Sequence, residues 1–198
     1  MLFTKTQIKI LKLLCSTITK SYSIRAISRA IKQSYPLTYH SAKDLIKKGF
    51  IIEDAHRFLS LNYKSNFQDL AYIESLRAEE LFKKHKEIML FVDEILKKTE
   101  GFFTLLIFGS YAIGEETKNS DTDILMIIEK TEDADKEEKF LNRIADMYLK
   151  KHHCYVIGKE SVKEMIKERD KLNVINETLN KHIIFFGADD YYRLMQER

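Results

Sequence analysis

The first third of the chain consists of short segments with helical periodicity, separated by turn residues. Apolar residues recur every three or four positions after Thr4, Ser23 and Thr38, and each of these hydroxyl residues is suited to cap a helix. Pro36 separates the second segment from the third, and Gly49 follows the end of the third. The pattern therefore predicts three helices before residue 50.

Two short apolar runs follow, at 50–52 and 58–61, and the polar residues between them predict a two-stranded hairpin. From about residue 66 to residue 98 the periodicity is helical again, without a glycine or a proline. This stretch predicts one long connecting helix, or two helices with a bend, rather than a flexible linker.

Beyond Gly101 the pattern changes from helical spacing to continuous apolar runs. The runs at 102–108 and 123–128 predict two buried strands, and residues 154–157 predict a third. The helices expected in this region are 136–151, a helical stretch near 160–182, and 189–197.

Together these elements predict a chain of the α/β (α+β) class with a small mixed sheet. Its expected parts are an N-terminal domain of three helices and a hairpin (1–64), a helical connector (65–100) and a strand-containing domain (101–198). Hydrophobic residues make up 44% and charged residues 32% of the 198 positions, a composition that excludes a disordered chain.

The sequence contains no recognisable targeting or membrane segment. No apolar run approaches the roughly 18 residues that a membrane span needs, and the N-terminus lacks the order of a signal peptide. Cys15 and Cys154 are far apart and lie in apolar surroundings, as expected for reduced thiols. We therefore expect a cytoplasmic protein that has no membrane partner.

The net charge of +3 is an average over two unlike parts of the chain. Residues 1–64 contain twelve lysine and arginine residues against three acidic residues, a formal charge of +9, so the remainder carries −6. This asymmetry predicts that the basic part meets a polyanion while the acidic part has a different role.

The order of elements in residues 4–62 resembles a winged helix-turn-helix domain, above all in the stretch 23–52. The resemblance implies that the third helix enters the major groove of duplex DNA and that the hairpin lies beside the DNA backbone. The residues expected at that interface are Thr38, Tyr39, His40, Lys43, Lys47 and Arg57. Homodimerisation or protein docking is the alternative, whereas RNA is disfavoured because the sequence shows no aromatic platform for stacked bases.

The sequence around the first two predicted strands contains two polar motifs. The first strand ends in Gly109 and Ser110 at the start of a helix, and the second strand opens with Asp121 and Asp123. Carboxylates two residues apart lie on the same face of an extended chain. Such a pair suits a divalent cation, and the amides at a helix start suit phosphate groups. The two motifs together favour the binding of a metal-bound nucleotide.

In residues 102–130 this arrangement resembles the nucleotidyltransferase superfamily of DNA polymerase beta, specifically its minimal nucleotidyltransferases. The resemblance implies that Gly109 and Ser110 hold the phosphates of an NTP, and that Asp121 and Asp123 are catalytic and hold Mg²⁺ (or Mn²⁺). A nucleoside monophosphate would pass to an acceptor hydroxyl and pyrophosphate would leave. Some minimal members are antitoxins that modify a partner protein, so a protein acceptor stands beside small molecules and RNA.

Two positions depart from the pattern of that family. Catalytic members usually carry a third carboxylate on a later strand, whereas the strand at 153–157 has no acid and Glu160 lies just beyond it. Ile113 stands where many minimal members have arginine. The alternative to an active transferase is therefore a DNA-binding transcriptional regulator whose C-terminal domain binds a nucleotide without turnover.

His152, His153 and Cys154 are consecutive residues of the types that bind zinc. Consecutive residues of a strand point to alternate faces, so these three side chains are not expected to meet at one ion. The sequence therefore predicts no zinc site.

Overall fold

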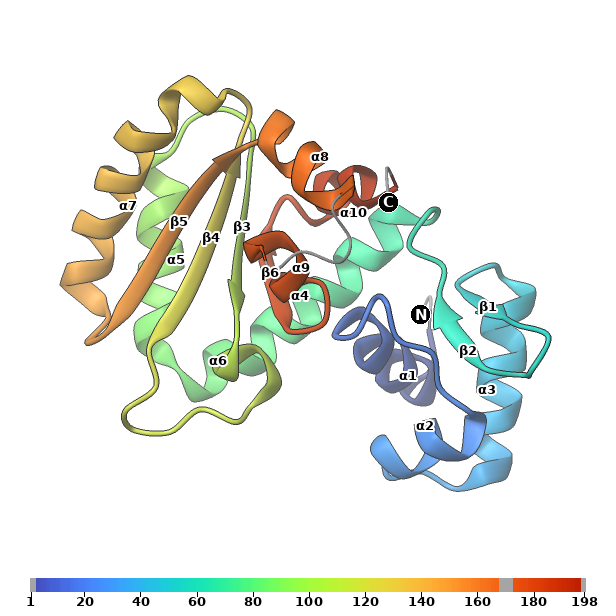
Figure 1. Cartoon of the computed structure of the whole chain (residues 1–198). Coiled ribbons are helices and arrows are strands. Elements are labelled where there is room, and N and C mark those ends of the chain that lie inside the picture. Colours follow the sequence, from blue (N-terminus) through green and yellow to red (C-terminus); the bar gives the residue numbers. More distant parts are fainter. Residues whose placement is uncertain (1–2, 168–172, 197–198) are drawn as a thin grey trace.

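A computed structural model of the chain describes residues 3–167 and 173–196 (Figure 1). The N-terminal unit, residues 3–64, contains three helices followed by a hairpin, in the predicted order. Its elements are α1 (Lys5–Cys15), α2 (Ile24–Ala30), α3 (Tyr35–Lys47), β1 (Ile51–Glu53) and β2 (Leu59–Leu61).

The first two helices begin where the sequence predicts. Thr4 accepts a hydrogen bond from the Gln7 amide while the Gln7 side chain accepts one from the Thr4 amide, which completes a capping box. Ser23 caps α2 by accepting a hydrogen bond from the amide of Ala26. Side-chain capping that needs only neighbouring residues is thus confirmed at both positions.

The start of α3 corrects the prediction that Thr38 caps this helix. The helix begins at Tyr35, because Pro36 lies in its first turn, where the missing amide hydrogen costs nothing. Thr38 is therefore a helical residue, fully buried, whose hydroxyl donates to the carbonyl of Ser34 at 2.9 Å. Gly49, with a φ of 79°, follows the end of the helix as predicted.

The hairpin is antiparallel, with Ile51 paired to Leu61 and Glu53 to Leu59. A further bridge joins Leu59 to Tyr22, in the segment before α2. The hairpin is therefore attached to the helices through its second strand as well as through its chain connection to α3.

The predicted connector consists of two helices with a bend, α4 (Phe67–Lys84) and α5 (Lys86–Lys98). The break is at His85, whose backbone (φ −126°, ψ 81°) is not helical. Helix α4 is not a spacer between separate bodies, because it packs against α1, α10 and β6 (Figure 1).

The remaining elements build a sheet with helices on both faces. They are β3 (Phe103–Phe108), α6 (Ser110–Ile113), β4 (Thr122–Ile128), the short 3-10 helix η1 (Thr131–Asp133), α7 (Ala134–Tyr148), β5 (His152–Gly158), α8 (Lys159–Lys167), α9 (Val174–Thr178), β6 (His182–Phe186) and α10 (Ala188–Met195). Among the described residues the sheet has four strands in the order β5-β4-β3-β6, of which only β4 and β5 are parallel. The expected small mixed sheet is confirmed.

The helical stretch expected near 160–182 is only partly helical. Helices α8 and α9 occupy parts of it, residues 168–172 lie outside the described residues, and the stretch ends at the first residue of β6. The strand β6 itself was not predicted. It pairs antiparallel with β3 and contains Phe185 and Phe186, two residues that the sequence suggests as core.

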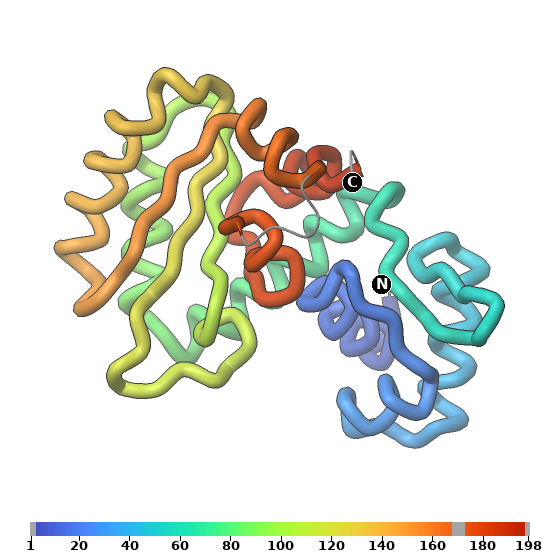
Figure 2. The backbone as a smooth tube through the Cα atoms, viewed as in Figure 1, coloured from blue at the N-terminus to red at the C-terminus, as the bar shows by residue number. Residues whose placement is uncertain are grey.

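One face of the sheet is covered by α5 and α7, and the other packs against α4, α8 and α10 (Figure 1). The core on the second face continues into the N-terminal unit, since Leu14 of α1, Ile73 of α4 and Leu106 of β3 belong to one cluster of buried residues. Figure 2 shows the red-orange stretch around α9 lying between the sheet and α1, where the amide of Ile18 donates to the carbonyl of Leu179. The division at residues 64 and 100 stays a prediction, and the parts it separates share a packed core.

Within the described ranges, none of the helices is both long enough and apolar enough to cross a membrane.

Candidate functional site

The pairing of β3 with β4 brings the two polar motifs together. Phe108, the last residue of β3, is paired with Asp123, so the turn at Gly109 lies directly beside the Asp123 carboxylate. Gly109 has a φ of 74°, and a Cβ atom at this position would lie 2.8 Å from Asp123 Oδ2. Only glycine therefore allows this backbone conformation and this approach of the carboxylate together.

The turn after β3 is held by the residue that precedes β6. The amide of Gly109 donates to the carbonyl of Lys181 at 3.1 Å, just before β6 begins. Ser110 then opens α6 and is partly exposed. The turn is therefore held by the Lys181 carbonyl on one side and lies close to Asp123 on the other, and Ser110 is partly accessible.

The two aspartates flank the first residue of β4. Thr122 is buried, and its amide donates to the carbonyl of Lys151 at 3.0 Å, which ties the start of β4 to the start of β5. Asp121 and Asp123 are both partly exposed. Because they are two residues apart, their side chains leave the strand on the same side.

The electrostatics of Asp123 favour a positive partner. Burial raises the pKa of the Asp123 carboxyl above its usual value, and the nearby charge of Asp121 adds to this effect. The His153 ring offsets part of the increase, with Nδ1 at 3.3 Å from Asp123 Oδ1. The ionised carboxylate is thus less stable here than in water, and a bound cation would remove that penalty.

The residues present fit a divalent cation held jointly by the chain and a ligand. Asp121 and Asp123 supply hard oxygen donors, and the glycine at 109 leaves the space beside Asp123 open. In the part of the chain that the structure describes, no group of three His, Cys, Asp or Glu side chains is arranged to hold a metal ion. Mg²⁺ commonly takes one or two carboxylates and completes its shell with substrate phosphates and water.

The residue of β5 that lies beside Asp123 is a histidine. His153 of β5 is paired with Asp123 in the parallel β4–β5 ladder, and its side chain is 58% exposed. Glu160 is excluded as a substitute, because β5 runs from the aspartates to the other end of the sheet, where Gly158 pairs with Ile128. Glu160 follows that end and forms an ion pair with Lys163 at 3.0 Å.

The side chains of β5 alternate as expected for a strand with one open face. Cys154 and Val156 are buried, whereas His153 and Tyr155 are exposed on the side of the aspartates. The Tyr155 ring lies 5.9 Å from the ring of Phe108. Tyr155 was not singled out from the sequence, although the alternation of 153 and 155 with two apolar residues was a usable signal.

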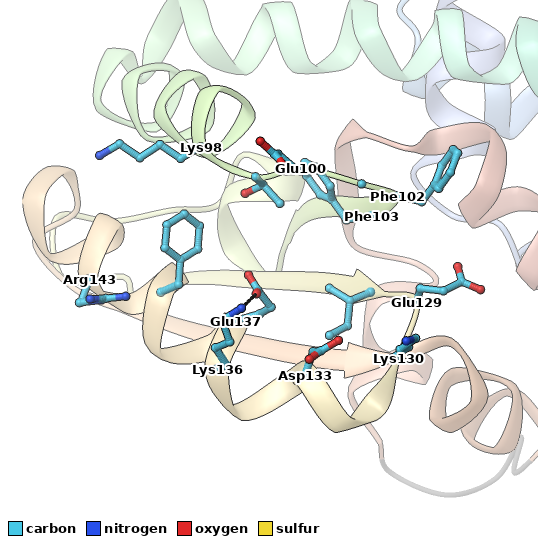
Figure 3. A pocket seen from close by; sticks show the side chains of 14 residues that line it. Lys98, Glu100, Phe102, Phe103, Glu129, Lys130, Asp133, Lys136, Glu137 and Arg143 are labelled. Carbon is cyan, nitrogen blue, oxygen red and sulfur yellow. Dashed lines mark ion pairs between the residues drawn. The ribbon is translucent and has the colours of Figure 1, made fainter.

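A cavity of about 510 Å³ lies at the opposite end of the sheet (Figure 3). Phe103 and Ile128, which form the pair at that end of the β3–β4 ladder, both line it. Phe103 is five residues from Phe108 along β3, which corresponds to about 17 Å. This cavity is therefore separate from the aspartates, and its other labelled lining residues are Lys98, Glu100, Phe102, Glu129, Lys130, Asp133, Lys136, Glu137 and Arg143.

The residues that were expected to bind DNA differ in their exposure to solvent. Tyr39, His40, Lys47 and Arg57 are exposed on α3 and the hairpin loop. The ammonium of a fifth residue, Lys43, forms an ion pair with Glu53 Oε2 of β1 at 2.7 Å, so part of its charge is already compensated.

Thr38 corrects that list. Its side chain is fully buried and its hydroxyl is engaged within α3. It is therefore not available for a contact with a base, and the other five residues stay a prediction.

Residues 86–181 match the family model described as Nucleotidyltransferase domain. The match begins with α5 and includes Gly109, Ser110, Asp121 and Asp123. It covers just under half of the chain and ends before β6, which nevertheless pairs with β3 in the same sheet. Comparison with curated proteins and with solved structures yields no match. The chain therefore contains a nucleotidyltransferase domain, and its candidate site lies within the matched residues.

Proposed function

We propose that this protein transfers a nucleoside monophosphate from an NTP to an acceptor hydroxyl. The observation that carries the proposal is the approach of Asp123 to the Gly109 turn, with Asp121 beside it, inside the segment that matches the nucleotidyltransferase family. Two carboxylates next to a glycine turn are the residue types that a divalent cation and a phosphate group would require.

In the proposed reaction the acceptor hydroxyl oxygen forms a bond to the α-phosphorus, the bond to pyrophosphate breaks, and the hydroxyl proton passes to water. Gly109 and Ser110 would position the phosphates, and Asp121 and Asp123 would hold Mg²⁺ or Mn²⁺. The cation would neutralise charge on the phosphates during transfer. The Asp123 carboxylate, whose pKa is raised by burial, would regain a favourable environment when the cation binds.

The test is incubation of the chain with each of four α-³²P-labelled NTPs, Mg²⁺ or Mn²⁺, and separate protein, RNA and small-molecule acceptor fractions. We expect label on one class of acceptor, and its loss in Asp121→Asn/Asp123→Asn. Asp133→Asn is the matched control, because Asp133 lies at the other end of the sheet. Transfer that persists in the double variant would contradict the proposal.

For the N-terminal unit we propose a winged helix-turn-helix fold that binds duplex DNA. The support is the formal charge of +9 on residues 1–64, the helix and hairpin arrangement, and the exposure of His40, Lys47 and Arg57. Binding should weaken steeply with salt because lysine and arginine contacts to phosphate release counterions.

The DNA-binding proposal is tested by fluorescence anisotropy on a duplex of random sequence. Lys47→Ala should weaken binding and reduce its salt dependence, whereas Lys97→Ala on α5 should change neither. Absent or salt-independent binding would favour protein docking or homodimerisation instead.

A second candidate function is a DNA-binding transcriptional regulator whose nucleotidyltransferase domain binds an NTP without turnover. The observation that favours it is His153 beside Asp123, at the place where a third carboxylate would lie. Cation-dependent NTP binding without transfer to any acceptor fraction would support the regulator. Transfer in the labelling experiment would reject it.

A further inference from the structure

We propose that His153 takes the place of a third metal-binding carboxylate, so that the site holds a single divalent cation, bound together with the NTP. This inference rests on the proposed nucleotide-binding function and specifies its metal stoichiometry. It concerns His153, which lies on the strand where the sequence offers no third carboxylate and which is not expected to bind zinc.

His153 lies directly beside Asp123 in the sheet. Asp123 and His153 are neighbours in the parallel ladder of β4 and β5, and their side chains are 28% and 58% exposed on the same open face. The flanking Cys154 is buried on the opposite side. His153 is therefore the side chain that β5 presents beside Asp123.

His153 also contacts the Asp123 carboxylate. Its Nδ1 lies 3.3 Å from Asp123 Oδ1. Two catalytic cations lie about 3.5–4 Å apart and need carboxylate oxygens on both sides. Here Asp121 and Asp123 supply one side, and the oxygen of Asp123 that faces β5 is already in contact with the ring.

The imidazole of His153 is a poor ligand for Mg²⁺ or Mn²⁺. Mg²⁺ and Mn²⁺ prefer carboxylate, carbonyl and water oxygens, whereas imidazole suits zinc, copper, iron and nickel better. Glu160, the nearest acid after β5, follows the other end of the strand and is paired with Lys163. The residue that β5 presents beside Asp123 is thus a histidine rather than a carboxylate, and Asp121 and Asp123 provide carboxylate ligands for one hard cation.

The nucleotide supplies the ligands that the chain lacks. Because no three suitable side chains converge among residues 3–167 and 173–196, the cation has two protein carboxylates and must gain its other ligands from phosphate and water. We therefore expect the cation to bind firmly only when the NTP binds.

The experiment counts bound Mn²⁺ per chain by electron paramagnetic resonance, with and without saturating α,β-methylene analogues of the four NTPs. The wild-type chain should bind one Mn²⁺ with an analogue and no firmly held Mn²⁺ without it. His153→Asp, which installs the missing carboxylate, should bind two. His153→Asn, which is neutral and of similar size, should stay at one.

Binding of an analogue is measured in parallel by calorimetry. This measurement distinguishes a failure of nucleotide binding from a failure of the single-cation inference. Two Mn²⁺ on the wild-type chain, or one on His153→Asp, would overturn the inference while leaving nucleotide binding intact. Failure of all four analogues to bind a chain with an unaltered circular dichroism spectrum would overturn the proposed function and the inference with it. His153 is largely exposed, so its substitutions are not expected to disturb folding.

Discussion

Glu74 and Asp123 are both carboxylates removed from water beside the same sheet, yet their surroundings differ. Glu74 lies on α4, fully buried between the N-terminal unit, β6 and α10. Asp123 lies at the open end of β4 and remains partly exposed. The difference between these two regions separates a charge that holds the structure together from a charge that is available to a ligand.

The Glu74 carboxylate is surrounded by donors. Arg77 Nη1 lies 2.6 and 2.8 Å from its two oxygens, the Tyr192 hydroxyl donates at 2.9 Å, and the amide of Ile184 donates at 3.2 Å. Arg77 also donates to the carbonyl of His182. Since buried charges need partners on every side, this cluster fastens α4 to β6 and α10.

The Asp123 carboxylate has a single weak partner. Of the described residues, His153 alone lies within hydrogen-bond distance of its oxygens, at 3.3 Å, while Asp121 adds repulsion. Perturbed carboxylates with open surroundings are typical of functional sites. A buried charge with several partners, such as Glu74, should therefore affect stability when its partners are removed. A charge with few partners, such as Asp123, should affect activity instead.

The largest effect on stability is expected at the satisfied charge. Arg77→Ala leaves Glu74 buried without its cation and should lower the free energy of unfolding by about 3–5 kcal/mol, measured by urea denaturation. Lys83→Ala removes an exposed ion pair of the same helix, 3.8 Å from Glu79, and should cost less than about 1 kcal/mol. Equal losses in the free energy of unfolding would show that the buried Glu74–Arg77 pair contributes no more to stability than an exposed ion pair.

At the unsatisfied charge the large effect should fall on activity instead. Asp123→Asn should reduce nucleotide transfer by roughly 100- to 1,000-fold, because it removes a ligand of the charge-neutralising cation. The free energy of unfolding should not fall. Burial raises the pKa of Asp123, so its ionisation costs stability as the pH rises above the usual aspartate pKa of about 3.9.

The variant should therefore equal the wild type in stability below that pH and slightly exceed it at pH 7. A loss of stability at pH 7 similar to that of Arg77→Ala would show that Asp123 is a structural charge as well.

His182 gives the buried region a pH dependence of the opposite sign. Burial lowers the pKa of His182 to about 4, so the folded chain keeps the ring neutral while the unfolded chain binds a proton below about 6.5. Its stabilising contribution is present above pH 6.5 and is lost as the pH falls toward 4, by as much as about 3 kcal/mol.

Urea denaturation between pH 4 and pH 8 measures this effect, with His182→Asn as the comparison because its amide can replace the Nδ1 contact to Thr178. The wild type should lose stability relative to the variant on acidification. Parallel pH profiles of the two proteins would contradict the assignment.

The smallest expected effect concerns the glycine turn beside Asp123. Gly109 (φ 74°, ψ −144°) has a backbone conformation that only glycine adopts readily, whereas Gly114 (φ 71°, ψ 28°) lies in the left-handed helical region, where alanine costs about 1–2 kcal/mol. A Cβ at Gly109 meets Asp123 Oδ2, whereas one at Gly114 meets nothing within 4 Å. We expect Gly109→Ala to weaken NTP binding about tenfold more than Gly114→Ala in calorimetry. Equal affinities would show that the approach of Asp123 to the turn is unimportant.

Features that depend on neighbouring residues were predictable from the sequence. The caps of Thr4 and Ser23 and the two strands next to Gly109 and Asp123 follow from local patterns, and the structure contains them. Thr38 was misplaced because the proline at 36 was treated as a break, although the first helical turn accepts it.

Features that depend on register were not predictable. The strand β6 is a short apolar run whose pattern does not distinguish a strand from a buried helix. The Lys181 carbonyl that holds Gly109 depends on that strand. The position of His153 beside Asp123 requires the parallel pairing of β4 and β5, which is set by the crossover through α7 rather than by the residues of either strand.

The most direct test of the account measures the affinity of the chain for α,β-methylene NTP analogues with and without Mn²⁺, in the wild type, Asp123→Asn and Asp133→Asn. We expect binding that requires Mn²⁺, is about 100-fold weaker in Asp123→Asn, and is unchanged in Asp133→Asn. Binding of equal strength without Mn²⁺, or in Asp123→Asn, would contradict the claim that the Gly109–Asp123 region is a cation-dependent nucleotide site.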